Sequence, residues 1–164
     1  MTVSSPPAGT PARATSDEIT VGEVMHPGVL VCGPESPLRH AARVMATHGV
    51  HAVVVLGDDE AGGLWGIVSD TDLVTAIARR ELDLHTAGGM ARTPLVTVSR
   101  EQSLAQATEL MSEHGVTHLV VVGARNRPIG IVSTLDIARA VAAGLVVKRR
   151  AGASGAGPRG GGDR

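Results

Sequence analysis

The chain has 164 residues and a formal net charge of −1, so no overall electrostatic field would attract nucleic acid or an anionic membrane. Trp65 is its only residue among Phe, Tyr and Trp, which disfavours a site that stacks bases on aromatic rings. A single cysteine, Cys32, and the lack of an apolar run of about 18 residues predict a cytoplasmic protein with no internal disulfide and no membrane span.

The first half of the chain predicts a strand, a helix, a pair of strands and a second helix. Residues 1–17 are rich in Pro, Ser, Thr and Ala and are expected to be disordered, and residues 18–80 are expected to form one unit. Its first helix opens at Ser36-Pro37 and stops at Gly49, and its second helix follows Ser69. The expected strands cover residues 29–32, 53–56 and 65–68.

The second half predicts the same order after a connecting segment. Residues 81–93 are expected to link the halves, and residues 94–147 to form the second unit. The expected strands cover residues 95–98, 119–122 and 129–132, and the expected helices cover residues 102–114 and 134–143. Residues 148–164, rich in Gly and Arg, are expected to be a disordered tail.

The two units are copies of one another. Gly66-Ile67-Val68-Ser69 returns as Gly130-Ile131-Val132-Ser133, and two extra residues within 57–63 of the first copy predict a hairpin loop. The repeat predicts the α/β class, with two β-α-β-β-α repeats packed around a shared core by pseudo-twofold symmetry and paired clefts between them. The matched positions are Leu38 with Leu104 and Met45 with Met111, each 66 residues apart, and Met25 with Met90, 65 residues apart.

Each copy carries a Gly-x-x-Ser-x-x-Asp element at the start of its last helix. As a capping box, Ser69 with Asp72 and Ser133 with Asp136 would satisfy the first N–H groups of that helix, without any ligand. The same geometry also suits a nucleotide, because a helix N-terminus attracts phosphate and a carboxylate accepts hydrogen bonds from a ribose diol. The preceding glycines, Gly66 and Gly130, predict that another backbone approaches closely there.

These two motifs, the helix-to-strand passages that contain HGV, and the repeated element order resemble a tandem pair of cystathionine-β-synthase (CBS) domains, also called a Bateman module. The resemblance covers residues 20 to 146. It implies two small sheets packed together, clefts that bind adenosine nucleotides or related compounds, homodimers, and regulation of another protein.

The resemblance also implies roles for individual residues. Asp72 and Asp136 would bind ribose hydroxyls, with Ser69 and Ser133 near ribose or phosphate, and Gly66 and Gly130 would belong to the same two sites. The strand entries at Val31 and Thr97 would contact the base through their backbone, and Thr117-His118 would face phosphate. His118 is equally well interpreted as a structural histidine, and the contrast between Ala52 and His118 at matched positions predicts two unequal clefts.

Other function classes find less support. No His, Cys and Asp cluster has the spacing of a zinc site, and no nucleophile is paired with a base, so neither a metal site nor an enzyme is predicted. We therefore expect no obligatory cofactor; AMP, ADP, ATP or S-adenosylmethionine is the expected regulatory ligand. The alternative is a ligand-independent adaptor or dimerisation module. The expected partners are this small molecule, a second copy of the chain and a regulated protein that the sequence does not identify.

Overall fold

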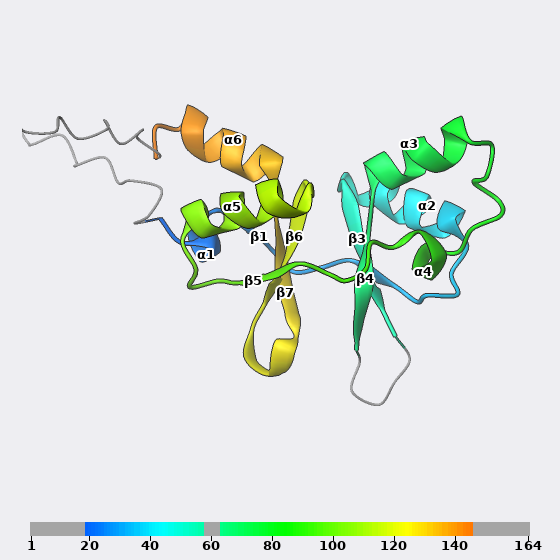
Figure 1. The fold of residues 1–164 in the computed structure, drawn as a ribbon, viewed down its shortest axis with the longest axis horizontal. Helices are drawn as coiled ribbons and strands as arrows, with labels where there is room; N and C mark the ends of the chain where they lie inside the picture. The colour runs from blue at the N-terminus through cyan, green and yellow to red at the C-terminus, as the bar shows by residue number, and fades with distance from the viewer. Residues whose placement is uncertain (1–18, 58–62, 146–164) are drawn as a thin grey trace, which may run out of the picture.

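The computed structural model describes residues 19–57 and 63–145 (Figure 1). The expectations for residues 1–17 and 148–164, and for the centre of the loop at 57–63, lie outside these residues. The first half contains α1 (Val21–Val24), β1 (His26–Pro27), β2 (Val31–Cys32), α2 (Leu38–His48), β3 (Ala52–Leu56), β4 (Leu64–Ser69) and α3 (Asp70–Ala78). The second half contains α4 (Ala87–Met90), β5 (Thr97–Ser99), α5 (Leu104–His114), β6 (His118–Val122), a 3₁₀ turn η1 (Ala124–Asn126), β7 (Pro128–Ser133) and α6 (Thr134–Ala142).

The predicted β-α-β-β-α order is confirmed in both halves. The sequence missed the short helices α1 and α4 and the two-residue strand β1, and it began the strands at β2 and β5 two residues too early. Helices α2 and α5 end as expected, because Gly49 and Gly115 adopt the left-handed conformation with φ of 64° and 61°.

Two small sheets face each other across the middle of the molecule. In the first sheet β3 pairs in parallel with β2 and antiparallel with β4, and in the second β6 pairs in parallel with β5 and antiparallel with β7. The facing sides meet in a shared apolar cluster built on Ala52, Val54, Ile67 and Val120. The helices cover the outer sides of the two sheets (Figure 1). Strand β3 is therefore buried on both faces, as its uninterrupted apolar run predicts.

The segments that precede the two repeats are exchanged between the halves. Strand β1 pairs antiparallel with β7, and Val21 of α1 is fully buried in the core of the second half. In return, Ala87 of α4 is fully buried in the core of the first half, and Arg92 bridges to Ile67 of β4. Each half is thus completed by the segment that leads into the other half.

The exchange corrects one matched pair of the sequence analysis. Helices α1 and α4 begin at Val21 and Ala87, 66 residues apart, so Met90 corresponds to Val24 and not to Met25. The β-bridges Thr20–Ser103 and Pro37–Thr86 follow the same spacing. The error arose because the sequence match paired two identical residues, Met25 and Met90, near the ends of the two helices. The helix starts, which follow Thr20 and Thr86, give the correct spacing.

The glycines of the repeated element lie where the exchanged segments cross the sheets. A Cβ at Gly130 would come within 2.5 Å of the His26 carbonyl oxygen. A Cβ at Gly66 would come within 2.8 Å of the Ala91 Cβ and 2.9 Å of the Arg92 carbonyl oxygen. Both contacts are closer than a side chain permits, which confirms the predicted close approach of another backbone.

Candidate ligand-binding cavity

The carboxylate of Asp136 closes the N-terminus of α6. Its Oδ2 accepts from the backbone N–H of Ser133 at 2.8 Å and from the Ser133 hydroxyl at 2.7 Å. The Asp136 N–H donates in return to Ser133 Oγ at 3.3 Å. Asp72 is held in the same way at the start of α3, where its Oδ2 accepts from Ser69 N and Oγ at 2.8 and 2.7 Å. Both capping boxes predicted from the sequence are therefore present.

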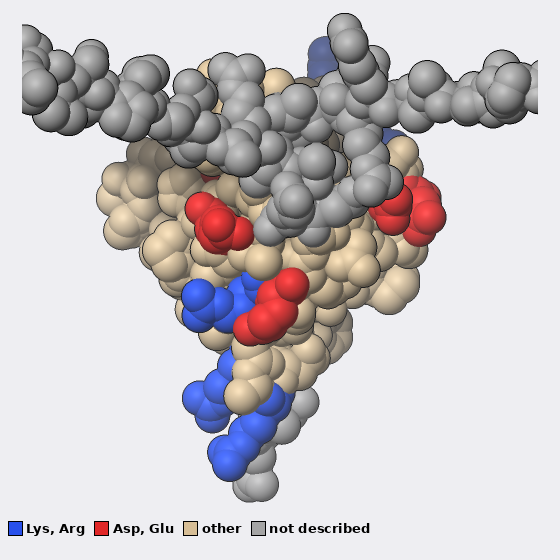
Figure 2. All heavy atoms as spheres, turned by 90° about the vertical axis from the view of Figure 1, so that its left-hand side faces the viewer, with Lys and Arg blue, Asp and Glu red and all other residues tan. Residues whose placement is uncertain are grey.

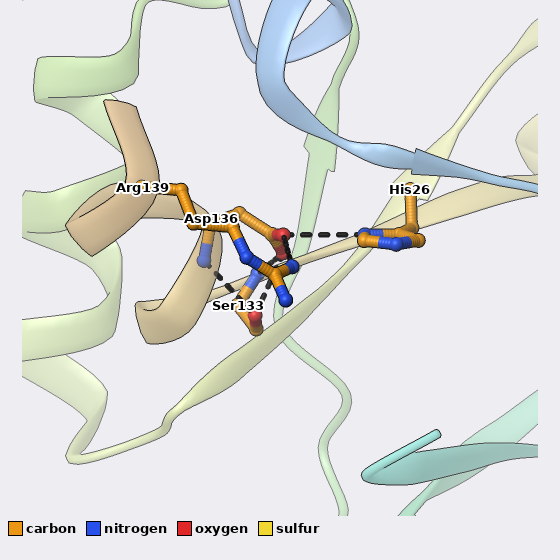
Figure 3. Close-up of polar contacts among 4 residues, drawn as sticks. All are labelled: His26, Ser133, Asp136 and Arg139. Atoms are coloured by element: carbon orange, nitrogen blue, oxygen red, sulfur yellow. Dashed lines mark hydrogen bonds and ion pairs between the residues drawn. The ribbon is translucent and has the colours of Figure 1, made fainter. Parts of the chain in front are cut away.

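The second oxygen of Asp136 faces basic side chains. Asp136 Oδ1 lies 3.2 Å from Nδ1 of His26 and 3.4 Å from Nη1 of Arg139 (Figure 3). Asp136 is only 5% exposed, whereas His26 is 68% exposed. One oxygen thus serves the helix cap, while the other meets groups at the surface.

Among the residues that the structure describes, Asp72 has one basic neighbour of this kind. Its Oδ1 lies 3.4 Å from Nε of Arg92. Arg92 forms a β-bridge with Ile67 of β4, and His26 pairs with Ile131 of β7. Arg92 and His26 therefore occupy equivalent places on the exchanged segments. The pseudo-symmetry therefore puts a basic side chain of an exchanged segment against each buried carboxylate, an imidazole at Asp136 and a guanidinium at Asp72.

A cavity of about 360 Å³ opens beside Asp136. Both halves contribute to it, because the crossing segment at Gly28–Leu30 and residues 49–52 face β6, β7 and α6. Its lining residues are His26, Pro27, Gly28, Val29, Leu30, Gly49, Val50, His51, Ala52, His118, Ile131, Ser133, Leu135, Asp136 and Arg139. It combines an apolar wall with a few converging polar groups, as small-molecule sites commonly do.

Two further histidines of the cavity have fixed partners. His51 Nδ1 lies 2.9 Å from Asp70 Oδ2, and His118 Nδ1 lies 2.9 Å from Thr117 Oγ1. Burial lowers the pKa of His118, because its imidazolium loses hydration; nearby Asp70 opposes this shift and His51 adds to it. His118 is therefore mainly neutral at pH 7.

The cavity gathers only some of the residues named from the sequence. His118, Ser133 and Asp136 line it. Ser69 and Asp72 cap α3 in the other half, Gly66 and Gly130 lie in β4 and β7 at the crossings, and Thr117 contributes through its bond to His118. Val31 and Thr97 lie in β2 and β5 and are not lining residues, whereas the neighbouring Val29 and Leu30 are.

The sequence analysis did not name His26, His51 or Arg139 as site residues. His26 joins the site only because β1 crosses to β7, which the register of the repeats did not reveal. Arg139 follows Asp136 by three residues on a helix, a spacing that places both side chains on one face and was a usable signal.

The face of the molecule drawn in Figure 2 carries charges of both signs. Figure 2 shows acidic and basic side chains mixed on one face, with basic side chains gathered at the lower end over the turn between β6 and β7. Arg125 and Arg127 belong to this turn. Among residues 19–57 and 63–145, no cluster of three or more His, Cys, Asp and Glu side chains could hold a metal ion. No helix within these ranges is long and apolar enough to cross a membrane.

Known proteins resemble the chain in sequence and in fold. Hypoxic response protein 1 of Mycobacterium tuberculosis is 34% identical over 122 residues, which cover 73% of this chain and 83% of that protein. A crystal structure of Hypoxic Response Protein I with two coordinated zinc ions has a TM-score of 0.60 at 31% identity, covering 73% of this chain and 97% of that one.

Two solved structures with bound adenosine compounds share the fold. A CBS domain protein from Pyrobaculum aerophilum complexed with AMP has a TM-score of 0.67 at 26% identity, covering 77% of this chain and 98% of that one. A CBS domain pair in complex with 5′-methylthioadenosine and S-adenosylmethionine has a TM-score of 0.68 at 21% identity, covering 76% of this chain and 96% of that one. At that identity the second likeness concerns the fold alone. The model of the CBS domain matches residues 21–79 and again 87–143, and the chain therefore belongs to the CBS domain family as a tandem pair of domains.

Proposed function

We propose that the chain is a regulatory module that binds an adenosine nucleotide or adenosyl compound in the cavity beside Asp136 and thereby alters its contacts with another protein. The observation that carries this proposal is a cavity formed jointly by both halves, in which a buried carboxylate presents one oxygen outward. A ligand that touches both halves shifts their arrangement to the extent that it binds one arrangement more tightly than another, and such a difference in affinity is the requirement for a regulatory effect. The AMP complex of the related protein supports the adenosine class.

The two oxygens of Asp136 allow capping and ligand binding to coexist. Oδ2 is occupied by Ser133, whereas Oδ1 becomes available to ribose hydroxyls when the His26 and Arg139 side chains move away from it. The apolar residues Val29, Leu30 and Ile131 supply a surface for the base. We propose that binding is the whole activity, with no chemical reaction, and that the protein works in the cytoplasm, where its buried unpaired Cys32 stays reduced.

A calorimetric titration with AMP, ADP, ATP, 5′-methylthioadenosine and S-adenosylmethionine tests this function. Asp136→Asn and Asp72→Asn are a matched pair, because each removes the same carboxylate charge from its helix cap but only Asp136 lines the cavity. We expect saturable binding that Asp136→Asn weakens about tenfold or more, since a hydrogen bond to a charged group contributes about 1.5–3 kcal/mol. Asp72→Asn should retain the affinity. Equal losses in both variants, or no heat from folded protein with any compound, would reject the proposal.

A homodimer is the second part of the proposal, and it would also serve a ligand-independent adaptor. Val74 and Ile77 of α3 are 66% and 59% exposed, and Val141 of α6 is 54% exposed, so the last helix of each half offers apolar side chains to solvent. A second copy of the chain would bury them by symmetry. Sedimentation of Ile77→Glu should show a shift from dimer to monomer, whereas Leu84→Glu, 78% exposed on the connecting segment, should not. A wild-type monomer at micromolar concentration would exclude this dimer.

A further inference from the structure

The cavity beside Asp136 is rich in groups that can carry positive charge. Three imidazoles, those of His26, His51 and His118, line it together with the guanidinium of Arg139. Asp136 is the only acidic residue among the described residues that line it. This excess of basic over acidic groups should make the cavity treat anionic and cationic adenosine compounds differently.

The three imidazoles use one ring nitrogen each for protein contacts. His26 Nδ1 faces Asp136, His51 Nδ1 faces Asp70, and His118 Nδ1 faces the Thr117 hydroxyl. Within residues 19–57 and 63–145, no other hydrogen bond or ion pair engages these rings. Each Nε2 therefore remains for a ligand, and a protonated imidazole offers it as a donor.

The negative charge of Asp136 does not cancel the positive charge that the three imidazoles and the Arg139 guanidinium can carry. Its Oδ2 already accepts from the Ser133 N–H and hydroxyl, and it lies at the N-terminus of α6, where the helix dipole favours an anion. Arg139, 61% exposed, is held to Oδ1 by one contact of 3.4 Å, so its guanidinium can reorient towards a ligand.

We propose that this cavity selects the phosphate-bearing members of the adenosine class, with the phosphate bound by the cavity's imidazoles and the Arg139 guanidinium. The inference rests on the proposed function, since it specifies which adenosine compound that site takes. Phosphate oxygens accept charge-assisted hydrogen bonds from both kinds of donor. The sulfonium of S-adenosylmethionine would add a positive charge to this set, and the thioether of 5′-methylthioadenosine offers these donors no anion.

Phosphate binding should also draw a proton into the cavity. Burial lowers the pKa of His118 in the free protein, and a phosphate dianion beside it would favour the imidazolium. The charged groups that act on His118 are Asp70, Asp72 and Asp136, which favour its protonation, and His51, which opposes it. The three carboxylates are present with or without ligand, so the phosphate itself drives the added uptake.

Calorimetry of the full chain with AMP, adenosine, 5′-methylthioadenosine and S-adenosylmethionine tests this selection at pH 7.0 and 8.5. AMP keeps nearly the same charge at both, because the second pKa of a phosphate monoester is about 6. We expect AMP to bind at least about tenfold more tightly than adenosine at pH 7.0, with the ratio falling at pH 8.5. In buffers of different ionisation enthalpy at pH 7.0, the heat of AMP binding should reveal proton uptake, whereas the heat for adenosine should not.

The matched variants are His118→Gln in the cavity and His114→Gln at the exposed end of α5. His118→Gln should lower the affinity for AMP severalfold more than the affinity for adenosine and abolish most of the proton uptake, and His114→Gln should change neither affinity. Equal affinities for AMP and adenosine, or tighter binding of S-adenosylmethionine, would overturn the phosphate selection but leave the adenosine site intact. If no compound binds to folded protein, both the proposed function and this inference fail.

Discussion

Single residues of this protein serve packing and chemistry at the same time, and Gly130 is the clearest example. It lies in the repeated motif, three residues before Ser133, yet its local role is to let β1 cross β7. The crossing brings the neighbouring His26 to Asp136. A change at this glycine therefore affects both stability and the cavity.

Gly130→Ala should lower the free energy of unfolding by about 1–3 kcal/mol, because the added methyl group would displace the His26 backbone. Gly33→Ala is the matched control, since a Cβ there meets only the Ser36 hydroxyl, at 3.8 Å. It should change stability by no more than about 0.5 kcal/mol. Urea unfolding followed by circular dichroism measures both variants. Equal stabilities would mean that β1 does not hold to β7 as the structure shows.

His118 should make stability depend on pH. Its lowered pKa means that the unfolded chain, with an ordinary histidine pKa of about 6.5, binds a proton more readily than the folded chain. The contribution of neutral His118 to the free energy of unfolding is fully present above about pH 6.5 and is lost as the pH falls towards the folded-state pKa. In His118→Asn, the loss of unfolding free energy between pH 7.5 and 5.5 should be smaller than in wild type. His40→Asn, on the exposed side of α2, should retain the wild-type loss; a parallel fall in all three proteins would contradict the assignment.

At the scale of elements, the exchanged segments are the feature that most affects how the halves depend on each other. The proposed boundaries of 18–80, 81–93 and 94–147 describe the order of the repeats along the chain. In space, Val21 belongs to the core of the second half, with Leu119 and Val132. The N-terminal end of the first repeat therefore stabilises the second one.

Val21→Ala should destabilise the protein by about 2 kcal/mol, since it removes two methyl groups from a fully buried side chain. Hydrogen exchange through local opening, as distinct from global unfolding, should rise in β6 and β7 and not in β3 and β4, because α1 packs with the second half. Val31→Ala, at a position 47% exposed, should leave both the stability and the hydrogen exchange nearly unchanged. Faster exchange confined to β3 and β4 would show that α1 belongs to the first half after all.

The elements that the sequence predicted are those with strong local signals. Apolar periodicity and Gly49 define α2, and the Ser-x-x-Asp pattern defines the starts of α3 and α6. Helices α1 and α4 have four residues each, too few to show periodicity, and β1 is a strand only because β7 lies beside it. His26 was missed for the same reason: its partner, Asp136, is 110 residues away, and no local pattern reports such a contact.

At the scale of the whole molecule, the two halves share a core where the sheets face each other. Val54 and Val120 occupy equivalent central positions on β3 and β6, and both are fully buried in the cluster between the sheets. Neither half covers this surface alone. The sequence predicted a shared core from the small size of each repeat, and the cluster at Val54 and Val120 confirms it.

The shared core should make the two halves unfold together. Trp65 reports on the first half, because it lies in β4 and its indole N–H donates at 3.3 Å to the Gly88 carbonyl oxygen of α4, the helix that packs into the core of the first half. Val120→Ala removes buried methyl groups from the second half and should cost about 2 kcal/mol. If the halves form one cooperative unit, the Trp65 fluorescence transition in urea should shift together with the circular dichroism transition, and both should keep a single midpoint. Val54→Ala, the equivalent change in the first half, should produce the same shift. A Trp65 transition that moves with Val54→Ala but stays in place with Val120→Ala would instead mean that the halves unfold separately, and a ligand bound between them could then act by tightening a loose contact.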